Sequence, residues 1–315
     1  MAIDSQRSWK HSFNAMMERL IEASQWLGLE NGRLVTYKKL LQEHYEGQRS
    51  NEHFLAFHQA MEILSIFESW KNHADDFLGL QAKISYVFKK GTILSGDESP
   101  NSNRPRNDGF VYIMAGKLLD GHGVKLLSVD SCLNKNGGQI FKAGNEDILL
   151  SLNGILVRIE CKRPMNSSTL AGNVETAYRQ IIDSTNTLPF GVIAVDISKL
   201  IERPNEYLEA SSLDEASKYL TDEVERVLKP FGSQYTDNRL LGLIGFASIP
   251  GVTTARSQIL KADGTPYEIT GMRTAVVSWV TINNPKATAG TLLQTLHKSL
   301  FSAASRIPQN AVLVT

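Results

Sequence analysis

The residues with the clearest chemical potential stand in a strongly apolar stretch, residues 145–164. It holds two carboxylates, Asp147 and Glu160, and one ammonium group, Lys162. Two carboxylates that share a site with a lysine can hold a divalent cation beside a polarised water molecule, which is the chemistry of phosphodiester hydrolysis. Whether these groups share a site depends on the strands that carry them.

An Asn-Gly pair, residues 153–154, lies between two alternating apolar runs, which is the strongest short-range signal for a β-hairpin. A two-residue turn there pairs Leu152 with Ile155, and each step outward moves one residue along both strands. Continued outward, the same register sets Asp147 opposite Glu160. The sequence therefore predicts that the two acids meet at the end of the hairpin far from the turn.

Side chains alternate along a strand, so this hairpin has two faces. The first face is wholly apolar and is predicted to lie against the core: Ile148, Leu150, Leu152, Ile155, Val157, Ile159 and Cys161. The second face carries the charged groups: Asp147, Leu149, Ser151, Leu156, Arg158, Glu160 and Lys162. The two acids and the lysine are expected on this second face, with Arg158 as an alternative partner for the acids.

Carboxylates directly opposite each other repel, because their Cβ atoms are only about 5 Å apart across a strand pair. A cation between them removes the repulsion, and Mg²⁺ is commonly held by one or two carboxylates plus water and phosphate. We expect Asp147 and Glu160 to be Mg²⁺ ligands, with the backbone carbonyl of Cys161 as a further ligand. Lys162 is expected to reach an attacking water or a phosphate oxygen. The alternative is a solvated ion pair between Glu160 and Lys162.

The elements around the hairpin predict an α/β protein. Residues 8–90 repeat apolar residues at helical spacing. Residues 95–109 are rich in Ser, Asn, Pro and Gly, which is typical of a linker or exposed loop. From residue 110 the pattern predicts helix, three strands, helix and strand, then a helix, two long strands and a closing helix. We expect an N-terminal helical domain (1–94) and an α/β domain (110–315) with a mixed central sheet flanked by helices.

Composition narrows the function classes. The 315 residues are 42% hydrophobic and 21% charged, which is ordinary for a globular protein. The net charge is zero, so a surface that contacts nucleic acid has to be a local basic patch. Two cysteines form no disulfide framework and suit a reducing compartment. The N-terminus lacks a signal-peptide pattern and no apolar run reaches membrane-spanning length, so we expect a cytoplasmic protein without a membrane partner.

The sequence "ECK" at residues 160–162, together with the hairpin geometry, resembles the PD-(D/E)XK nuclease superfamily, also called the restriction-endonuclease-like fold. Asp147 stands where the family has the aspartate of Pro-Asp, and Glu146 replaces the proline. The resemblance covers roughly residues 105–200 and implies a core of helix, three-stranded meander, helix and strand. It implies a Mg²⁺-dependent nuclease, with Mn²⁺ able to substitute, that acts on DNA, with RNA as an alternative substrate.

The resemblance also implies residue roles. It makes Asp147 and Glu160 metal ligands and Lys162 the residue that orients or activates the attacking water. Several branches of the family add a glutamine on the following helix, and Gln180 is the residue here that could contact the site or the substrate backbone.

One position departs from many relatives, which carry a carboxylate on the helix before the meander. Val111 stands there, and Asp108 is the nearest acid. This departure favours an alternative, a catalytically degenerate nucleic-acid-binding or assembly module on the same fold. The resemblance further implies a place in restriction or antiviral defence. The N-terminal helical region is expected to bind DNA, a partner protein or a second copy of the chain as a homodimer.

Overall fold

The computed structural model describes residues 9–48, 50–119, 121–136, 146–183, 190–202, 207–235, 237–253, 257–260, 266–269, 272–287, 289–302 and 310–314. The helices are α1 (Phe13–Leu27), α2 (Arg33–Tyr45), α3 (Asn51–Trp70), α4 (Leu80–Lys89), α5 (Arg104–Leu118), α6 (Ser167–Ile182), α7 (Ser198–Ile201), α8 (Leu213–Gly232) and α9 (Gly290–Ser302). Short 3-10 turns occupy Ala74–Asp76 and Ser95–Asp97. The strands are β1 (Trp9–Ser12), β2 (Val124–Val129), β3 (Cys132–Leu133), β4 (Ile148–Leu152), β5 (Ile155–Lys162), β6 (Phe190–Asp196), β7 (Leu208–Ala210), β8 (Leu240–Thr253), β9 (Ser257–Leu260), β10 (Pro266–Ile269), β11 (Met272–Asn283) and β12 (Asn310–Val314).

A mixed sheet of ten strands runs through the molecule in the order β1-β12-β11-β8-β6-β5-β4-β2-β3, with β7 also paired to β8. Strands β2, β4 and β5 form an antiparallel meander, and β6 joins β5 in parallel. Strand β8 is parallel to β6 and antiparallel to β11. The prediction of an α/β protein with a mixed sheet flanked by helices is confirmed. The short hairpin β9–β10 forms a separate two-stranded sheet.

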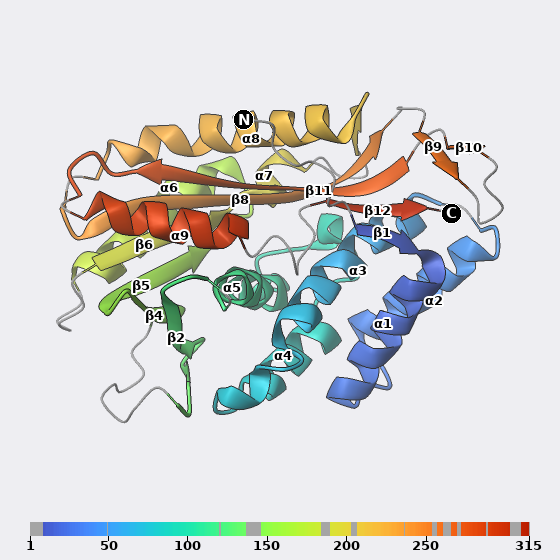
Figure 1. Ribbon diagram of the computed structural model, residues 1–315, viewed down its shortest axis with the longest axis horizontal. Coiled ribbons are helices and arrows are strands. Elements are labelled where there is room, and N and C mark those ends of the chain that lie inside the picture. The colour runs from blue at the N-terminus through green and yellow to red at the C-terminus, as the bar shows by residue number, and fades with distance from the viewer. Residues whose placement is uncertain are drawn as a thin grey trace.

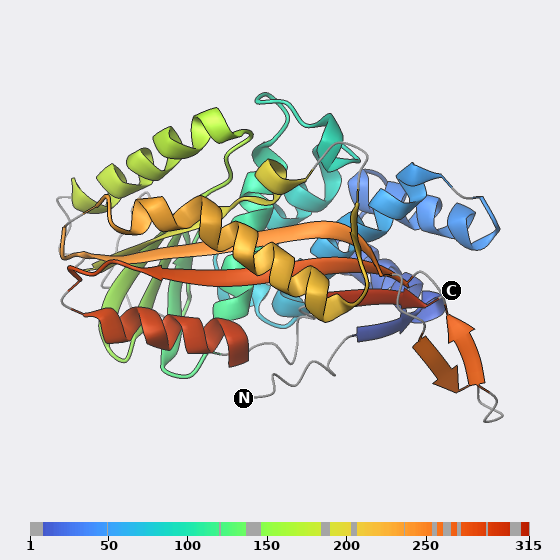
Figure 2. The same cartoon turned by 90° about the horizontal axis from the view of Figure 1, so that it is seen from above.

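Helices cover both faces of this sheet (Figure 1). On one side α6 and α8 pack against it, and Figure 2 shows α8 lying across β8 and β11. On the other side lie α5 and α3, with α1, α2 and α4 beyond them at one end (Figure 1). Two buried clusters follow from these layers. The larger joins the N-terminal helices, α5 and α9 to the sheet, and the smaller lies under α6 and α8.

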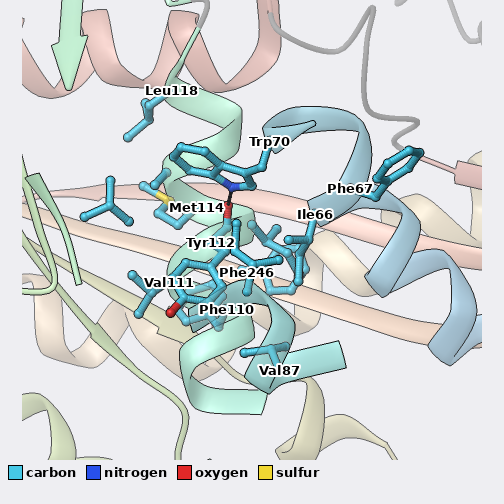
Figure 3. Close-up of a cluster of buried hydrophobic side chains, with 14 of the residues drawn as sticks. Ile66, Phe67, Trp70, Val87, Phe110, Val111, Tyr112, Met114, Leu118 and Phe246 are labelled. Carbon is cyan, nitrogen blue, oxygen red and sulfur yellow. Dashed lines mark hydrogen bonds between the residues drawn. The ribbon is translucent and has the colours of Figure 1, made fainter. Parts of the chain in front are cut away.

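Helix α5 is the centre of the larger cluster, because apolar side chains surround it on nearly all sides. Trp70 donates an indole hydrogen bond of 2.9 Å to the backbone carbonyl of Tyr112, which ties α3 to α5 (Figure 3). Phe110 stacks on Phe246 of β8 with ring centroids 5.5 Å apart. The N-terminal helices therefore share one apolar core with the sheet. The expected division into a helical and an α/β domain stays a prediction.

The segment expected to be a linker contains ordered structure. Its residues from Arg104 onward form the first turns of α5, with Pro105 in the first turn, where a missing backbone N–H costs little. Glu98 lies earlier in the segment, and its side chain is fully buried. It accepts two hydrogen bonds from Arg163, of 3.0 and 2.9 Å, and its carboxylate lies 3.3 Å from Arg106. A buried ionic contact therefore fastens this segment to the end of β5.

Within the described residues, no helix is both long enough and apolar enough to cross a lipid bilayer.

Candidate functional site

The turn that positions the site has the geometry expected from its sequence. Asn153 and Gly154 both adopt positive φ angles, 50° and 85°, as a type I′ turn requires. Leu152 pairs with Ile155, and the register continues without a shift to the pair Ile148 and Ile159. The predicted hairpin register is confirmed along the whole ladder between β4 and β5.

The ladder ends one residue before the two acids meet. Asp147 directly precedes β4, next to the last pair of the ladder. Its carboxylate accepts a 2.7 Å hydrogen bond from the backbone amide of Cys161. The acid therefore lies beside the end of β5, as the register predicted, but it is held by the β5 backbone.

The two faces of the hairpin are both largely covered. Five residues of the face predicted to be apolar core are fully buried: Ile148, Leu150, Leu152, Val157 and Ile159. Ile155 is an exception, 38% exposed beside the turn, and Cys161 is half-buried. The charged face is buried as well, because α6 packs over β5: Glu160 is 1% exposed and Arg158 5%. Glu160 is therefore not part of a solvated ion pair, which was the alternative considered from the sequence.

The structure brings Asp147, Glu160 and Lys162 together. The ammonium of Lys162 lies 3.8 Å from Asp147 Oδ2 and 3.6 Å from Glu160 Oε2. The other oxygen of Glu160 accepts a 2.5 Å hydrogen bond from Arg158. The alternative of Arg158 as a partner for the acids is therefore realised at Glu160, and one oxygen of that carboxylate still faces Lys162.

Burial shapes the electrostatics of both acids. It raises the pKa of Glu160, and the nearby charge of Asp147 raises it further, while Arg158 opposes the shift. Burial also raises the pKa of Asp147, against the effect of Lys162 and of the Cys161 amide. The carboxylates are thus incompletely compensated by the cations around them, so further positive charge at this place is favourable.

Helix α5 carries one acid, Asp108, near the position where many relatives have a carboxylate. Val111 is 7% exposed and belongs to the larger apolar cluster, so it lies within the core (Figure 3). Asp108, one turn earlier on α5, is half-buried. Burial raises its pKa, and the charges of Asp130 and Asp147 raise it further. The carboxylate of Asp108 lies 3.6 Å from the guanidinium of Arg104, one turn before it on α5.

Asp130 is a second acid that the sequence did not single out. It lies in the turn after β2, and its backbone amide donates a 2.7 Å hydrogen bond to the carbonyl of Asp147. Its carboxylate accepts a 2.8 Å hydrogen bond from the hydroxyl of Tyr112 and lies 3.0 Å from the ammonium of Lys83. No local motif marks Asp130 or Lys83, because the contacts that bring them to the site are distant in the sequence.

The donor set fits a hard divalent cation. Asp147 and Glu160 supply carboxylate oxygens, and the amide and carbonyl of one strand residue point to the same side of the strand. Since the Cys161 amide points to Asp147, its carbonyl points to that side too, beyond the end of β4. The Cys161 thiol is buried and its pKa lies well above the ordinary value because of burial, so only the carbonyl is a suitable ligand. In the part of the chain that the structure describes, no three His, Cys, Asp or Glu side chains gather in a metal-binding cluster, and Mg²⁺ needs only one or two carboxylates.

A pocket of about 360 Å³ adjoins Lys162 and Cys161, between the first turns of α5 and those of α6. Its polar lining was not foreseen in the sequence, where isolated asparagines carry no signal. Gln180 does not line it. That residue is exposed on α6, about 10 Å further along the helix axis than Asn173, which does line the pocket. A role for Gln180 stays a prediction.

Comparisons of the chain with models of protein families, with curated proteins and with solved structures found no match.

Proposed function

We propose that the protein is a metal-dependent nuclease that hydrolyses phosphodiester bonds of DNA. The observation that carries the proposal is the meeting of Asp147, Glu160 and Lys162 at the end of β5. The element order supports it: α5, the meander β2-β4-β5, α6 and the parallel strand β6 follow the order expected of a restriction-endonuclease-like core. The resemblance of "ECK" to the family motif supports it as well.

The chemistry of this site is derived from the chain's own groups. Asp147 and Glu160 hold negative charge that favours a divalent cation, together with the Cys161 carbonyl. When bound, Mg²⁺ or Mn²⁺ would neutralise phosphate charge and lower the pKa of water. Lys162 lies within reach of both acids, so it can hold the attacking water by one hydrogen bond. The water oxygen forms a bond to phosphorus and loses a proton to solvent, the bond to the leaving sugar oxygen breaks, and that oxygen takes up a proton from solvent to become a hydroxyl.

A cleavage assay tests the proposal. Purified protein is incubated with Mg²⁺ or Mn²⁺ and with linear, circular and single-stranded DNA and with RNA. The variants Glu160→Gln and Lys162→Met keep the side-chain size, and each is expected to abolish cleavage that the wild type performs. Matched controls are Glu225→Gln and Lys218→Met, both exposed on α8, which should cut like the wild type. Intact nucleic acid in every wild-type reaction contradicts the proposal.

A second function has its own supporting observation. Arg158 and Lys162 already neutralise Glu160 in part, which is the arrangement expected of a degenerate site that holds no metal. The protein would then be a nucleic-acid-binding or assembly subunit on the same fold. DNA binding without cleavage, unchanged by a chelator, supports this alternative. The proposal of a nuclease also includes a role in restriction or antiviral defence and binding of DNA, a partner protein or a second copy through α1 to α4, which need separate assays.

A further inference from the structure

The pocket beside Lys162 has a lining suited to one kind of ligand. It lies where the beginnings of α5 and α6 flank the end of β5. Its lining includes the polar residues Asn103, Asn107, Lys162, Asn166, Thr169 and Asn173. No aspartate or glutamate lines it. Its volume of about 360 Å³ lies near the lower end of the range for small-molecule sites.

The asparagine amides point to a ligand with both donors and acceptors. Asn173 already donates from Nδ2 to the Thr169 carbonyl, and Asn166 already accepts at Oδ1 from Thr169, so among the described residues the Oδ1 of Asn173 and the Nδ2 of Asn166 are the groups left for a ligand. An asparagine side chain offers a carbonyl oxygen and an NH₂ group, and such amides pair with the edges of nucleobases. The Oδ1 atom of Asn107 is buried and has no hydrogen-bond partner among the described residues. A buried acceptor without a partner is unfavourable, so a ligand donor that reaches it is favoured. An exocyclic amino group of a base is such a donor.

The charges at one end of the pocket suit a phosphate. Of the two cations in the lining, Lys162 is the one that can donate to a ligand, because the guanidinium of Arg163 is held by Glu98 and Asp196. The first turn of the 16-residue helix α6 also borders the pocket, and helix N-termini favour negative charge. The capping side chain of Asn166 already accepts from the amide of Thr169, so the helix end is ordered. A phosphate near Lys162 and a base among the asparagines describe one nucleotide.

We propose that this pocket takes one unpaired nucleotide of the nucleic-acid chain, next to the phosphate that is cut. The inference rests on the proposed nuclease function and names its substrate class: single strands, flaps or bases turned out of a helix. A continuous duplex does not fit, because its bases are stacked and their Watson–Crick edges are paired, so a base has to leave the helix to enter a pocket. Turning a base out of a stack costs least where the base is unpaired.

Binding of a fluorescent oligonucleotide tests the inference without cleavage. The anisotropy of a labelled single strand and of the same strand in a duplex is titrated with protein in EDTA. Wild type is expected to bind the single strand about ten-fold more tightly, the effect of one well-placed base contact. Asn173→Leu keeps the number of side-chain atoms and should bring the two affinities together. Ala171→Leu, exposed on α6 outside the pocket lining, should keep the preference.

Asn107→Leu is the second variant. Its unfolding curve is compared with that of the wild type to check that the variant folds. Because Asn173 is only half-buried, its variant gives a result even if the Asn107 variant does not fold. Equal wild-type affinities for the two DNA forms, or a preference that survives Asn173→Leu, overturn the inference. Cleavage with Mg²⁺ separates the two proposals. Cleavage without pocket-dependent preference refutes the pocket alone, and pocket-dependent binding without cleavage refutes the nuclease alone.

Discussion

The backbone amide of Cys161 donates a 2.7 Å hydrogen bond to the carboxylate of Asp147. This bond continues the contact between β4 and β5 by one step after the regular ladder has ended. It fixes the acid without help from a side chain, and the oxygen that accepts it, Oδ2, also lies 3.8 Å from the ammonium of Lys162. The position of the acid is thus built into the hairpin.

Asp147→Asn should separate this structural role from the chemical one. The amide oxygen of asparagine still accepts from Cys161, so the free energy of unfolding is expected to change by less than about 1 kcal/mol. The negative charge is lost, so cleavage should fall by at least about 100-fold, since even partners outside the ligand set typically cost 10–100-fold in metal affinity or activity. Urea unfolding and initial cleavage rates measure the two quantities. An Asp147→Asn variant that unfolds at a lower urea concentration but retains its cleavage rate would show that Asp147 has a structural role and not a chemical one.

Arg158→Met should destabilise the fold through Glu160. Both side chains are buried, so the variant leaves a carboxylate with one weaker partner in the interior. Removing one member of a buried pair typically costs about 3–5 kcal/mol. The double variant Arg158→Met with Glu160→Gln should recover most of that loss in urea unfolding.

The control for this experiment is an exposed pair. Arg226 lies 2.6 Å from Glu223 on α8 and is 68% exposed, so Arg226→Met should cost less than about 1 kcal/mol. Equal losses for the buried and the exposed variant would show that Arg158 does not compensate a buried charge.

Glu98→Gln tests how closely the N-terminal helices are joined to the sheet. Glu98 is the fully buried acid between Arg106 and Arg163, and its loss leaves two buried cations with fewer acceptors. A loss of about 3–5 kcal/mol is expected. The exposed pair of Arg179 and Glu175 provides the matched control Glu175→Gln.

The same samples report whether the chain unfolds as one unit. Trp26 and Trp70 lie in the N-terminal helices and Trp279 lies in β11, so fluorescence reports on tertiary packing in both parts, while circular dichroism reports on secondary structure along the whole chain. Because one apolar cluster spans these parts, the two signals should give the same midpoint. Two separated transitions would favour the independent helical domain expected from the sequence.

His58 should make stability fall in mild acid. Its ring lies 3.0 Å from both Ser248 Oγ and Gln59 Nε2, an arrangement that fits a neutral ring with one donor and one acceptor. Burial lowers the pKa of His58 below its ordinary value. The unfolded chain, with a histidine pKa of about 6.5, then binds the proton more readily than the folded chain. The contribution is fully present above about pH 6.5 and is lost as the pH falls below it.

The measurement is the difference in unfolding free energy between wild type and His58→Gln at several pH values. Other titrating groups are common to both proteins, so their effects cancel. From pH 7.5 to 5.5 the difference should move in favour of the variant, by at most about 1.4 kcal/mol per pH unit. A difference that is constant with pH would mean that folding leaves the pKa of His58 unchanged, which would contradict this prediction.

The sequence predicted that the charged side chains of the hairpin meet, because the turn and the strand register that bring them together are local features. Asn153-Gly154 set the turn, and alternation then placed Asp147, Glu160 and Lys162 on one face. It could not predict that α6 would bury Glu160, because the extent of cover depends on tertiary packing. The burial of Val111, which stands where many relatives have a carboxylate, depends on tertiary packing as well. Helix α5 is surrounded by apolar contacts there, and its one acid, Asp108, stands one turn earlier and pairs with Arg104.

Contacts between distant segments were out of reach of local patterns. Asp130 reaches the site through a backbone bond to Asp147, and Lys83 reaches Asp130 from α4. The polar composition of residues 95–109 favoured a linker, yet Glu98 is buried because Arg106 and Arg163 compensate its charge. Such a residue carries no apolar signal, so only the folded arrangement reveals that it is internal.

The proposed nuclease activity requires Asp147 and Glu160 to hold a divalent cation that takes part in phosphodiester hydrolysis. A crystal of the protein soaked in Mn²⁺, with anomalous data collected, tests it most directly. We predict an anomalous peak that contacts both carboxylates and the Cys161 carbonyl, at about 2.1 Å as for Mg²⁺. The peak should be absent from Asp147→Asn crystals treated in the same way. Ordered carboxylates with Lys162 still between them and no peak at saturating Mn²⁺ would contradict the account.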